Sequence, residues 1–187
     1  MTIADDAQHS GGLLINNTVL DAGPHNKYHN AYGMLMAKAT RDGMLLAKPD
    51  KRPFVLTRAN YIGGQRYAAT WTGDNKSTLK HMKLATPMCL NLGLSGQSFV
   101  GPDLGGFAGD ARPELFAQWM AIGAFYPFMR GHSSKGTNRK EPWSFGEEIE
   151  SSCRRSLHRR YRIIPYLYTM FWQSSIDGSA TMRAALF

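Results

Sequence analysis

Short strand-like runs alternate with helix-like segments through most of this chain, and this alternation is what most constrains its fold. Strand-forming residues gather at Phe54–Thr57, Tyr67–Trp71 and Ser98–Val100, and a fourth run lies at Tyr126–Met129. A strand–helix–strand–helix order is typical of parallel strands joined by crossover helices. The sequence therefore predicts an α/β fold.

Apolar residues at helical spacing mark the segments around these runs. Helices are predicted from Lys27 to Lys38, from Ser77 to Gly93, from Pro113 through Met120, and from Phe145 to Gln173. Gly43 is expected to close the first helical region, and Pro165 must kink the last helix. That helix carries an apolar stripe made of Ile149, Cys153, Leu157, Tyr161, Ile164 and Tyr168.

The composition limits the classes of protein that this chain can form. Of its 187 residues, 43% are hydrophobic, which is enough for one sizeable core and excludes wholesale disorder. No apolar run approaches the roughly 20 residues that span a bilayer. The first residues resemble no signal peptide, and the compartment stays open. Cys89 and Cys153 are predicted to be buried thiols rather than metal ligands or a disulfide.

The charge balance is basic, with 22 Lys and Arg against 14 Asp and Glu and a net charge of +8. Such a surplus suits a polyanionic partner. The densest basic patch lies in the last predicted helix and consists of Arg154, Arg155, Arg159, Arg160 and Arg162, with His158 among them. Glutamates precede it, and a helix dipole favours acid early and base late. We interpret the patch as a solvated helix face and expect no nucleic-acid partner, with nucleic-acid binding as the alternative.

Polar residues recur where the predicted strands end. Arg58, Asp74 and Asp103 each follow a strand candidate, and His132 lies just past the fourth. In parallel α/β folds, ligands bind at the carboxyl ends of the strands. The sequence therefore predicts a ligand site built from these side chains.

Six segments, in order along the chain, resemble glycoside hydrolase family 31. They are HNAYGMLMAKAT (29–40), RPFVLTRANYIGGQRYAATWTGDN (52–75), GLSGQSFVGPDLGGFAG (93–109), FYPFMRGHS (125–133), EPWSFGEE (141–148) and RRYRIIPYLYTMF (159–171). The likeness is to the α-glucosidase branch, including glucosidase II-like enzymes. It implies a partial TIM (β/α)₈ barrel, roughly the second half from strand 5 to helix 8. Residues 25–187 would form this partial barrel, and residues 1–24 an irregular N-terminal segment.

The resemblance implies a retaining α-glucosidase that hydrolyses O-glycosyl bonds at the α-linked glucosyl ends of an oligosaccharide or glucan. Two carboxylates about 5–5.5 Å apart carry this chemistry, one as nucleophile and one as acid/base, with no metal or organic cofactor. Asp74 in TWTGDN matches the acid/base. Trp71 would wall the sugar site and keep the surroundings of the acid apolar, which helps a carboxylic acid to stay protonated. From the residues alone, Gly-Asp-Asn is also a common turn.

The remaining site residues are carried over from the same resemblance. Arg58 matches an arginine that holds sugar hydroxyls and orients carboxylates. Asp103 matches a carboxylate that binds glucose hydroxyls, and Phe107 would line the pocket. His132 matches a histidine that bonds the sugar, and Arg130 is a weaker candidate. The alternatives are a structural ion pair for Arg58, ordinary loop packing around Asp103 and Phe107, and a structural histidine.

The family nucleophile lies in a Trp-x-Asp-Met-Asn-Glu type of motif, and these 187 residues contain no such motif. Asp5 and Asp6 lie in Ala-Asp-Asp-Ala, which does not match it. We expect that Met1 begins shortly after the nucleophile and that the polypeptide is a fragment. Alone it should be inactive, unstable or self-associating through exposed barrel edges. The alternative is an inactive sugar-binding remnant or a truncated gene product without turnover.

Overall fold

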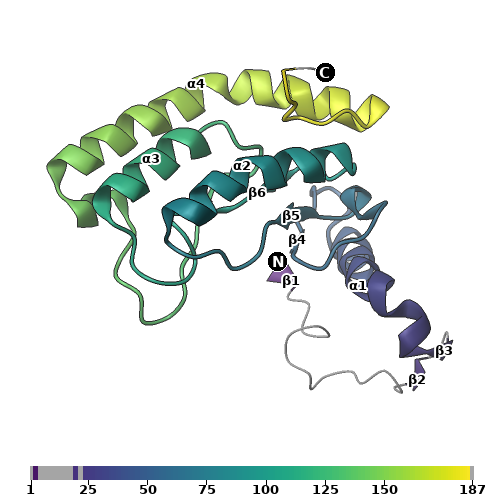
Figure 1. Cartoon of the computed structure of the whole chain (residues 1–187). Helices are drawn as coiled ribbons and strands as arrows, with labels where there is room; N and C mark the ends of the chain where they lie inside the picture. Colours follow the sequence, from purple (N-terminus) through teal and green to yellow (C-terminus); the bar gives the residue numbers. More distant parts are fainter. Residues whose placement is uncertain (1, 4–18, 21–22, 186–187) are drawn as a thin grey trace. The chain divides into compact units, whose positions relative to one another are not determined.

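The computed structural model describes residues 2–3, 19–20 and 23–185. The chain forms two compact units, Met1–Thr70 and Trp71–Phe187. Figure 1 shows the elements in chain order, from β1 (Thr2–Ile3) to α4 (Glu147–Asp177). Asp5 and Asp6, and most of the predicted irregular segment 1–24, lie outside the described residues. The described end of that segment pairs β2 (Val19–Leu20) with β3 (Gly23–Pro24) in an antiparallel ladder.

The first unit is built around α1 (His25–Ala47), which contains the predicted helix Lys27–Lys38 and extends it at both ends. The prediction that Gly43 closes this region is wrong. Gly43 lies inside the helix, where a Cβ would meet open space, so a glycine there costs helix stability without ending the helix. The helix ends before Pro49, because a residue that precedes proline is pushed out of the helical region.

β1, β4 (Leu56–Thr57) and β5 (Ala69–Trp71) pair in parallel, and all of their residues except Trp71 belong to the first unit. Leu56 pairs with Thr2 on one side and with Ala69 on the other. Every residue of β4 and β5 is buried. The first two predicted strands are therefore confirmed as parallel strands, and each is shorter than predicted.

In the second unit, β6 is Val100–Gly101, and β7 (Asp103–Leu104) pairs in parallel with β8 (Arg130–Gly131). The strand predicted at Tyr126–Met129 is wrong in position. Only Phe128 donates a ladder-like bond there, from its N–H to the Val100 carbonyl at 3.0 Å. Pro127 has no N–H to donate, so it interrupts a ladder.

The backbone carbonyls around the predicted strand Tyr126–Met129 accept hydrogen bonds from a side chain rather than from a neighbouring strand. The guanidinium of Arg160 donates to the carbonyl oxygens of Ala124, Tyr126 and Pro127 at 3.2, 2.5 and 3.0 Å. The prediction that Arg160 belongs to a solvated face is therefore wrong, because its head group is a structural link.

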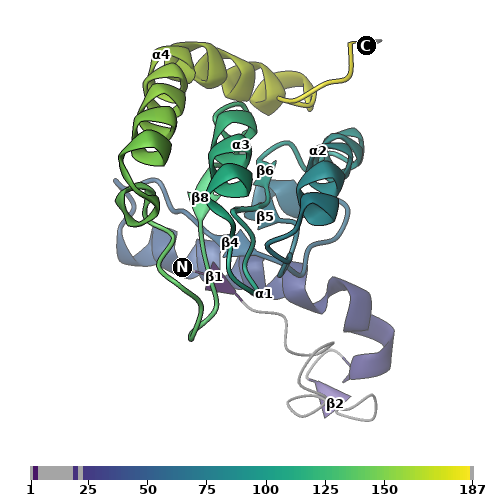
Figure 2. The ribbon, with the colours of Figure 1, turned by 60° about the vertical axis from the view of Figure 1, so that its left-hand side comes forward.

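Three helices cover the second unit, and Figure 2 shows α3 beside α4. They are α2 (Leu79–Leu94), α3 (Pro113–Gly123) and α4. The predicted start of α3 at Pro113 is confirmed, since a proline at the first helical position loses no intrahelical bond. Two short 3₁₀ turns, η1 (Gly64–Arg66) and η2 (Pro142–Phe145), complete the described elements.

The main core lies between these helices and the strands of the second unit. Trp119, Cys89 and Cys153 are completely buried in it, and Tyr126 is 1% exposed. The prediction of buried, free thiols is confirmed. Burial raises the pKa of Cys89 to about 12, which keeps this thiol protonated and unreactive at neutral pH.

Helix α4 buries only part of its predicted apolar stripe. Cys153 is buried, but Tyr161, Ile164 and Tyr168 are 71%, 44% and 66% exposed. For these three residues the predicted burial is wrong within the described chain. A hollow of about 440 Å³ adjoins this face and is lined in part by Leu104, Tyr161 and Ile164. The helix changes direction along its length (Figure 2), as expected because Pro165 removes one helical hydrogen bond.

Candidate functional site

A buried carboxylate lies at the centre of the candidate site. Asp103 in β7 is completely buried, and its neighbour across the ladder is Arg130 in β8. Arg130 donates from Nε and Nη2 to Asp103 Oδ1, at 3.1 and 2.5 Å. The parallel register therefore brings a cation directly to a carboxylate that burial would otherwise disfavour.

His132 completes this group from the loop after β8. Its Nδ1 lies 3.0 Å from Asp103 Oδ2 and 3.2 Å from Arg130 Nη2. Both contacts cannot be hydrogen bonds at once, because the arginine nitrogen can only donate. A proton on Nδ1 lets the imidazole donate to the buried carboxylate, so we assign the Nδ1–H tautomer. Nε2 is then the nitrogen left for a ligand, on a side chain that is 39% exposed.

Two aromatic rings flank the Asp103–Arg130–His132 group. The Phe107 ring lies with its centroid 4.9 Å from that of His132. Trp71 is 6% exposed, and the Arg130 guanidinium carbon lies 5.1 Å from the centroid of its ring, within cation–π range. No partner for the Trp71 indole N–H is found among the described residues. Four of the residues predicted from the sequence, Trp71, Asp103, Phe107 and His132, therefore come together in the second unit.

Asp74 lies in the loop that follows β5, and its side chain is exposed. Gly73, before it, has a φ of 85°, and Asn75, after it, is buried. The described residues thus do not supply the apolar surroundings expected for an acid catalyst. Asp74 is nevertheless tied to the Asp103 group through Asn75, whose side-chain amide donates to the Asp103 carbonyl at 3.0 Å.

Arg58 follows β4 in the first unit and is half-buried. The residue before it, Thr57, is buried and donates its hydroxyl to the Ala59 carbonyl at 3.1 Å. The role of Arg58 at the sugar stays a prediction.

Sequence reasoning ranked Arg130 low, although it is the direct partner of Asp103. The register of β7 against β8 places Arg130 directly opposite Asp103. The strand predicted at Tyr126–Met129 did not include Arg130, so this pairing was not foreseen. Asn75 and Lys140, which join neighbouring loops, were not singled out. The only sequence signal for Asn75 is its position next to Asp74.

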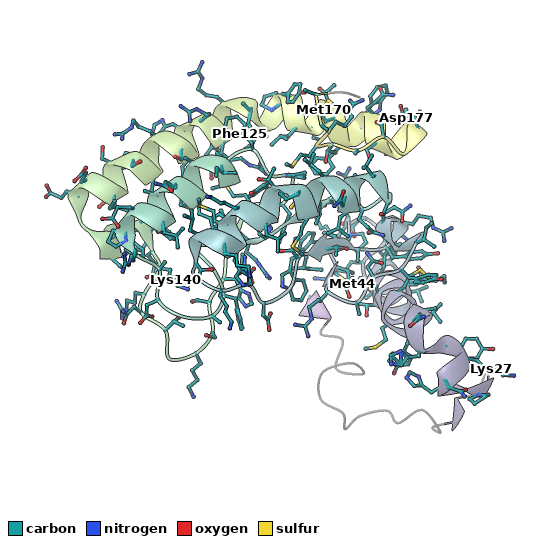
Figure 3. The ribbon with its side chains drawn as sticks, in the orientation of Figure 1. Lys27, Met44, Phe125, Lys140, Met170 and Asp177 are labelled. Atoms are coloured by element: carbon teal, nitrogen blue, oxygen red, sulfur yellow. The ribbon has the colours of Figure 1, made fainter. Side chains whose placement is uncertain are left out.

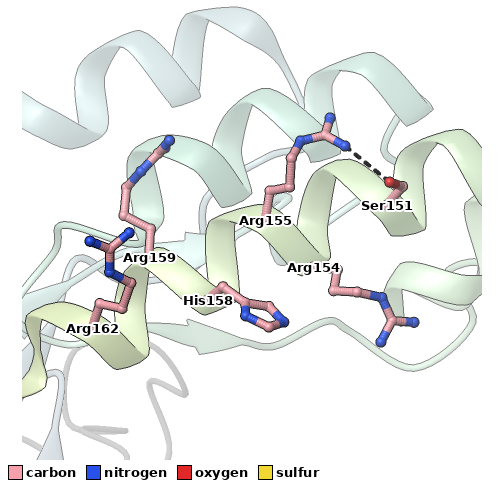
Figure 4. A pocket seen from close by; sticks show the side chains of 6 residues that line it. All are labelled: Ser151, Arg154, Arg155, His158, Arg159 and Arg162. Carbon is pink, nitrogen blue, oxygen red and sulfur yellow. Dashed lines mark hydrogen bonds between the residues drawn. The ribbon is translucent and has the colours of Figure 1, made fainter.

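The basic patch of α4 forms a shallow hollow of about 460 Å³ (Figure 4). Arg154 pairs with Glu150 at 2.5 Å, and Arg155 donates to the Ser151 hydroxyl at 3.0 Å. The lining residues are Ser151, Arg154, Arg155, His158, Arg159 and Arg162. These contacts are exposed and local to the helix, as expected for a solvated face.

Within the described residues, no group of three or more His, Cys, Asp or Glu side chains could hold a metal ion. The described helices include none that is long and apolar enough to cross a membrane.

Comparison with known proteins identifies the family. The profile of the Glycosyl hydrolases family 31 TIM-barrel domain matches residues 4–170. "Alpha-glucosidase 2" of Bacillus thermoamyloliquefaciens is 47% identical over 174 residues, which are 93% of this chain and 22% of the relative. "Neutral alpha-glucosidase AB" of Sus scrofa is 42% identical over 98% of this chain and 18% of its own length. The chain thus spans about a fifth of these curated relatives.

Solved structures agree. The family 31 α-glucosidase from Bacteroides thetaiotaomicron is 54% identical, with a TM-score of 0.83 over 92% of this chain and 29% of that one. The glucosidase II α subunit in its Glc1Man2-bound form is 37% identical, with a TM-score of 0.87 over 90% of this chain and 18% of that one. The chain therefore belongs to glycosyl hydrolase family 31, and its matched residues are part of the TIM-barrel domain of that family.

Proposed function

We propose that these residues supply the acid/base and most of a glucose-binding pocket to a retaining α-glucosidase. The chain would be roughly the second half of the barrel, with β4, β5, the segment of β6 and β7, and β8 as strands 5 to 8. The parallel pairing of β4 with β5 and of β7 with β8 supports this order. The substrate would be the α-linked glucosyl end of an oligosaccharide or glucan, as the names of the relatives suggest.

One observation carries the proposal. Asp103 accepts hydrogen bonds from both Arg130 and His132, and this group lies on the paired parallel strands β7 and β8 and the loop that follows β8; barrel enzymes bind their substrates at the loops that follow their strands. Asp103 fixes the imidazole so that Nε2 is available to a sugar hydroxyl. Because the Asp103 carboxylate has no exposed surface, its own contact with a hydroxyl would require a local opening.

The other roles follow from the chemistry. Asp74 would protonate the leaving glycosidic oxygen and then take a proton from water. Its exposed carboxylate is accessible to that oxygen. Trp71 and Phe107 would form apolar walls against the sugar ring, and Arg58 would bind hydroxyls.

Double displacement also needs a second carboxylate as nucleophile. The expected nucleophile motif is absent from the 187 residues, so we infer that this polypeptide binds the sugar but does not turn it over. The alternative, an inactive sugar-binding remnant, also predicts sugar binding without turnover. The coding sequence upstream of Met1 distinguishes a fragment of an active enzyme from such a remnant.

The test has two arms on the purified chain. Saturable binding of glucose or maltose, weakened when His132 is changed to Ala, supports the pocket; no binding by a folded sample contradicts it. In the second arm, p-nitrophenyl α-glucoside is offered to the chain and to Asp74→Asn. Turnover that the substitution abolishes would mean that a nucleophile is present after all.

A further inference from the structure

Two loops of the second unit lie against each other at the candidate site. We call residues 72–78, which contain Asp74, the acid loop, and residues 105–110, which contain Phe107, the pocket loop. We propose that Asn75 and Lys140 are positioning residues that hold the acid loop against the pocket loop and thereby fix Asp74 relative to the sugar-binding groups. This inference rests on the proposed function, since it assigns a purpose to Asp74.

Asn75 uses both its side chain and its backbone to bind the pocket loop. Its amide nitrogen donates to the Asp103 carbonyl at 3.0 Å, and its Oδ1 accepts the Phe107 N–H at 2.8 Å. Its main-chain carbonyl accepts from the N–H groups of Phe107 and Ala108, both at 2.9 Å. The side chain is therefore a clamp around the turn that separates Asp103 from Phe107. Because Asn75 is 8% exposed, water cannot readily replace these bonds.

Lys140, which is labelled in Figure 3, binds the same two loops from a third segment. Its Nζ donates to the Ser77 hydroxyl at 3.0 Å and to the carbonyls of Gly106 and Gly109 at 2.6 and 2.8 Å. All three donors of the ammonium group are thus used. Burial lowers the pKa of Lys140, and the nearby carboxylates Asp110 and Asp103 oppose this effect. Lys140 is only partly buried, and all three of its donors reach oxygen acceptors, which is the arrangement that makes charge-assisted hydrogen bonds strong.

The backbones themselves are in close contact. Gly106 has a φ of 86°, and a Cβ there would collide with the backbone nitrogen of Ser77. Ser77 also donates its N–H to the Ala108 carbonyl at 2.9 Å and its hydroxyl to the Gly109 carbonyl at 2.7 Å. The two loops therefore approach each other so closely at Gly106 and Ser77 that position 106 has no room for a side chain.

Asp74 is held in this arrangement through the residue that follows it. Its side chain is exposed, while Asn75, the next residue, is anchored to Asp103 and Phe107. An acid catalyst works only when it is held within hydrogen-bond reach of the leaving oxygen. Asn75 and Lys140 would supply that restraint without touching the sugar.

The experiment compares Asn75→Ala and Lys140→Met with two controls at exposed side chains of the same types, Asn91→Ala and Lys135→Met. Amide hydrogen exchange at Phe107 and Ala108, the backbone NMR order parameter at Asp74, maltose affinity and the unfolding midpoint are measured on the whole chain. A lost buried hydrogen bond opens a local contact by roughly a factor of ten. We expect about tenfold faster exchange, a lower order parameter at Asp74 and weaker maltose binding. Neither control should change, and Lys140→Arg, which keeps cationic donors, should restore all three.

Unchanged exchange in both variants would overturn the proposal. So would faster exchange that leaves the order at Asp74 unchanged, because the links would then be structural only. If the wild-type chain binds no maltose, the proposed function fails, and the order parameter at Asp74 still decides this inference. Should Asn75→Ala not fold, Lys140→Met alone gives the answer.

Discussion

The loops of the second unit are ordered by hydrogen bonds and ion pairs, whereas the later part of α4 leaves much of its apolar face exposed. Around the candidate site, polar groups are satisfied by residues of the chain itself, as in the Asp103–Arg130–His132 group and the links of Asn75 and Lys140. Along α4, Tyr161, Tyr168 and Trp172 remain 71%, 66% and 56% exposed. Directional bonds can order a site with few residues, whereas an apolar face needs a large covering surface. The charged and amide groups of the site are thus linked to one another, whereas the described residues leave this face of α4 exposed.

The largest expected effect comes from breaking the buried ion pair. Arg130→Met leaves the Asp103 carboxylate buried without its cation, which typically costs about 3–5 kcal/mol in the free energy of unfolding. Urea denaturation measures this loss. Arg154→Met is the matched control, because the Arg154–Glu150 pair is exposed and should contribute less than about 1 kcal/mol. Equal losses in the two variants would contradict the view that the polar site is the stable region.

The second-largest expected effect is a difference in stability between substitutions of two adjacent arginines of α4. Arg160→Met removes the donors to the carbonyls of Ala124, Tyr126 and Pro127 and should lower the free energy of unfolding by about 2–3 kcal/mol. Arg159→Met changes an exposed side chain of the basic hollow and should stay within about 0.5 kcal/mol of wild type. Thermal unfolding of both variants checks the difference. If Arg159→Met is the more damaging change, the structural role of Arg160 is disproved.

The uncovered face of α4 should govern self-association rather than stability. The double variant Tyr168→Lys and Trp172→Lys removes two exposed aromatic rings and should reduce association while changing the free energy of unfolding by less than about 1 kcal/mol. Sedimentation velocity over a range of concentrations measures it. A wild-type chain that stays monomeric throughout would show that this face does not drive assembly.

The smallest effect concerns the end of α4. The side-chain amide of Gln173 and the backbone N–H of Ser179 hold the pKa of Asp177 at about 2, below its ordinary 3.8. A carboxylate with a depressed folded pKa stabilises the fold above pH 3.8, and this contribution is lost as the pH falls toward 2. Asp177→Asn should therefore unfold with a slightly weaker pH dependence between pH 6 and pH 3 than wild type. NMR titration of the Asp177 carboxyl group tests the cause directly.

Local patterns were sufficient to predict much of the fold. Pro113 opens α3, the thiols of Cys89 and Cys153 are buried, and β4 and β5 are parallel, as periodicity and proline rules indicate. The fourth strand was misplaced because Pro127 has no N–H to donate to a ladder and because Arg160, more than thirty residues away, binds the carbonyls of Ala124, Tyr126 and Pro127. The predicted stripe on α4 assumed a covering surface that the described chain does not provide.

The residues of the candidate site also fall into those that the sequence could predict and those that it could not. Asp103 and His132 could be expected near each other, since each follows a strand end. Asn75 and Lys140 could not, because their bonds join loops that are 28 to 63 residues apart and have no regular spacing. Arg130 could be ranked correctly only once the register of β7 against β8 was known.

The contact between Arg130 and the Trp71 ring also has an optical consequence. The chain has four tryptophans, of which Trp71 and Trp119 are buried while Trp143 and Trp172 are exposed. Their fluorescence should therefore divide into a blue and a red component, and among the described residues only Trp71 has a cation recorded against its ring. A change in the position of the Arg130 guanidinium should therefore alter the blue component, to which Trp71 contributes. The fluorescence of Trp71 would thus report on the proposed pocket without an added dye.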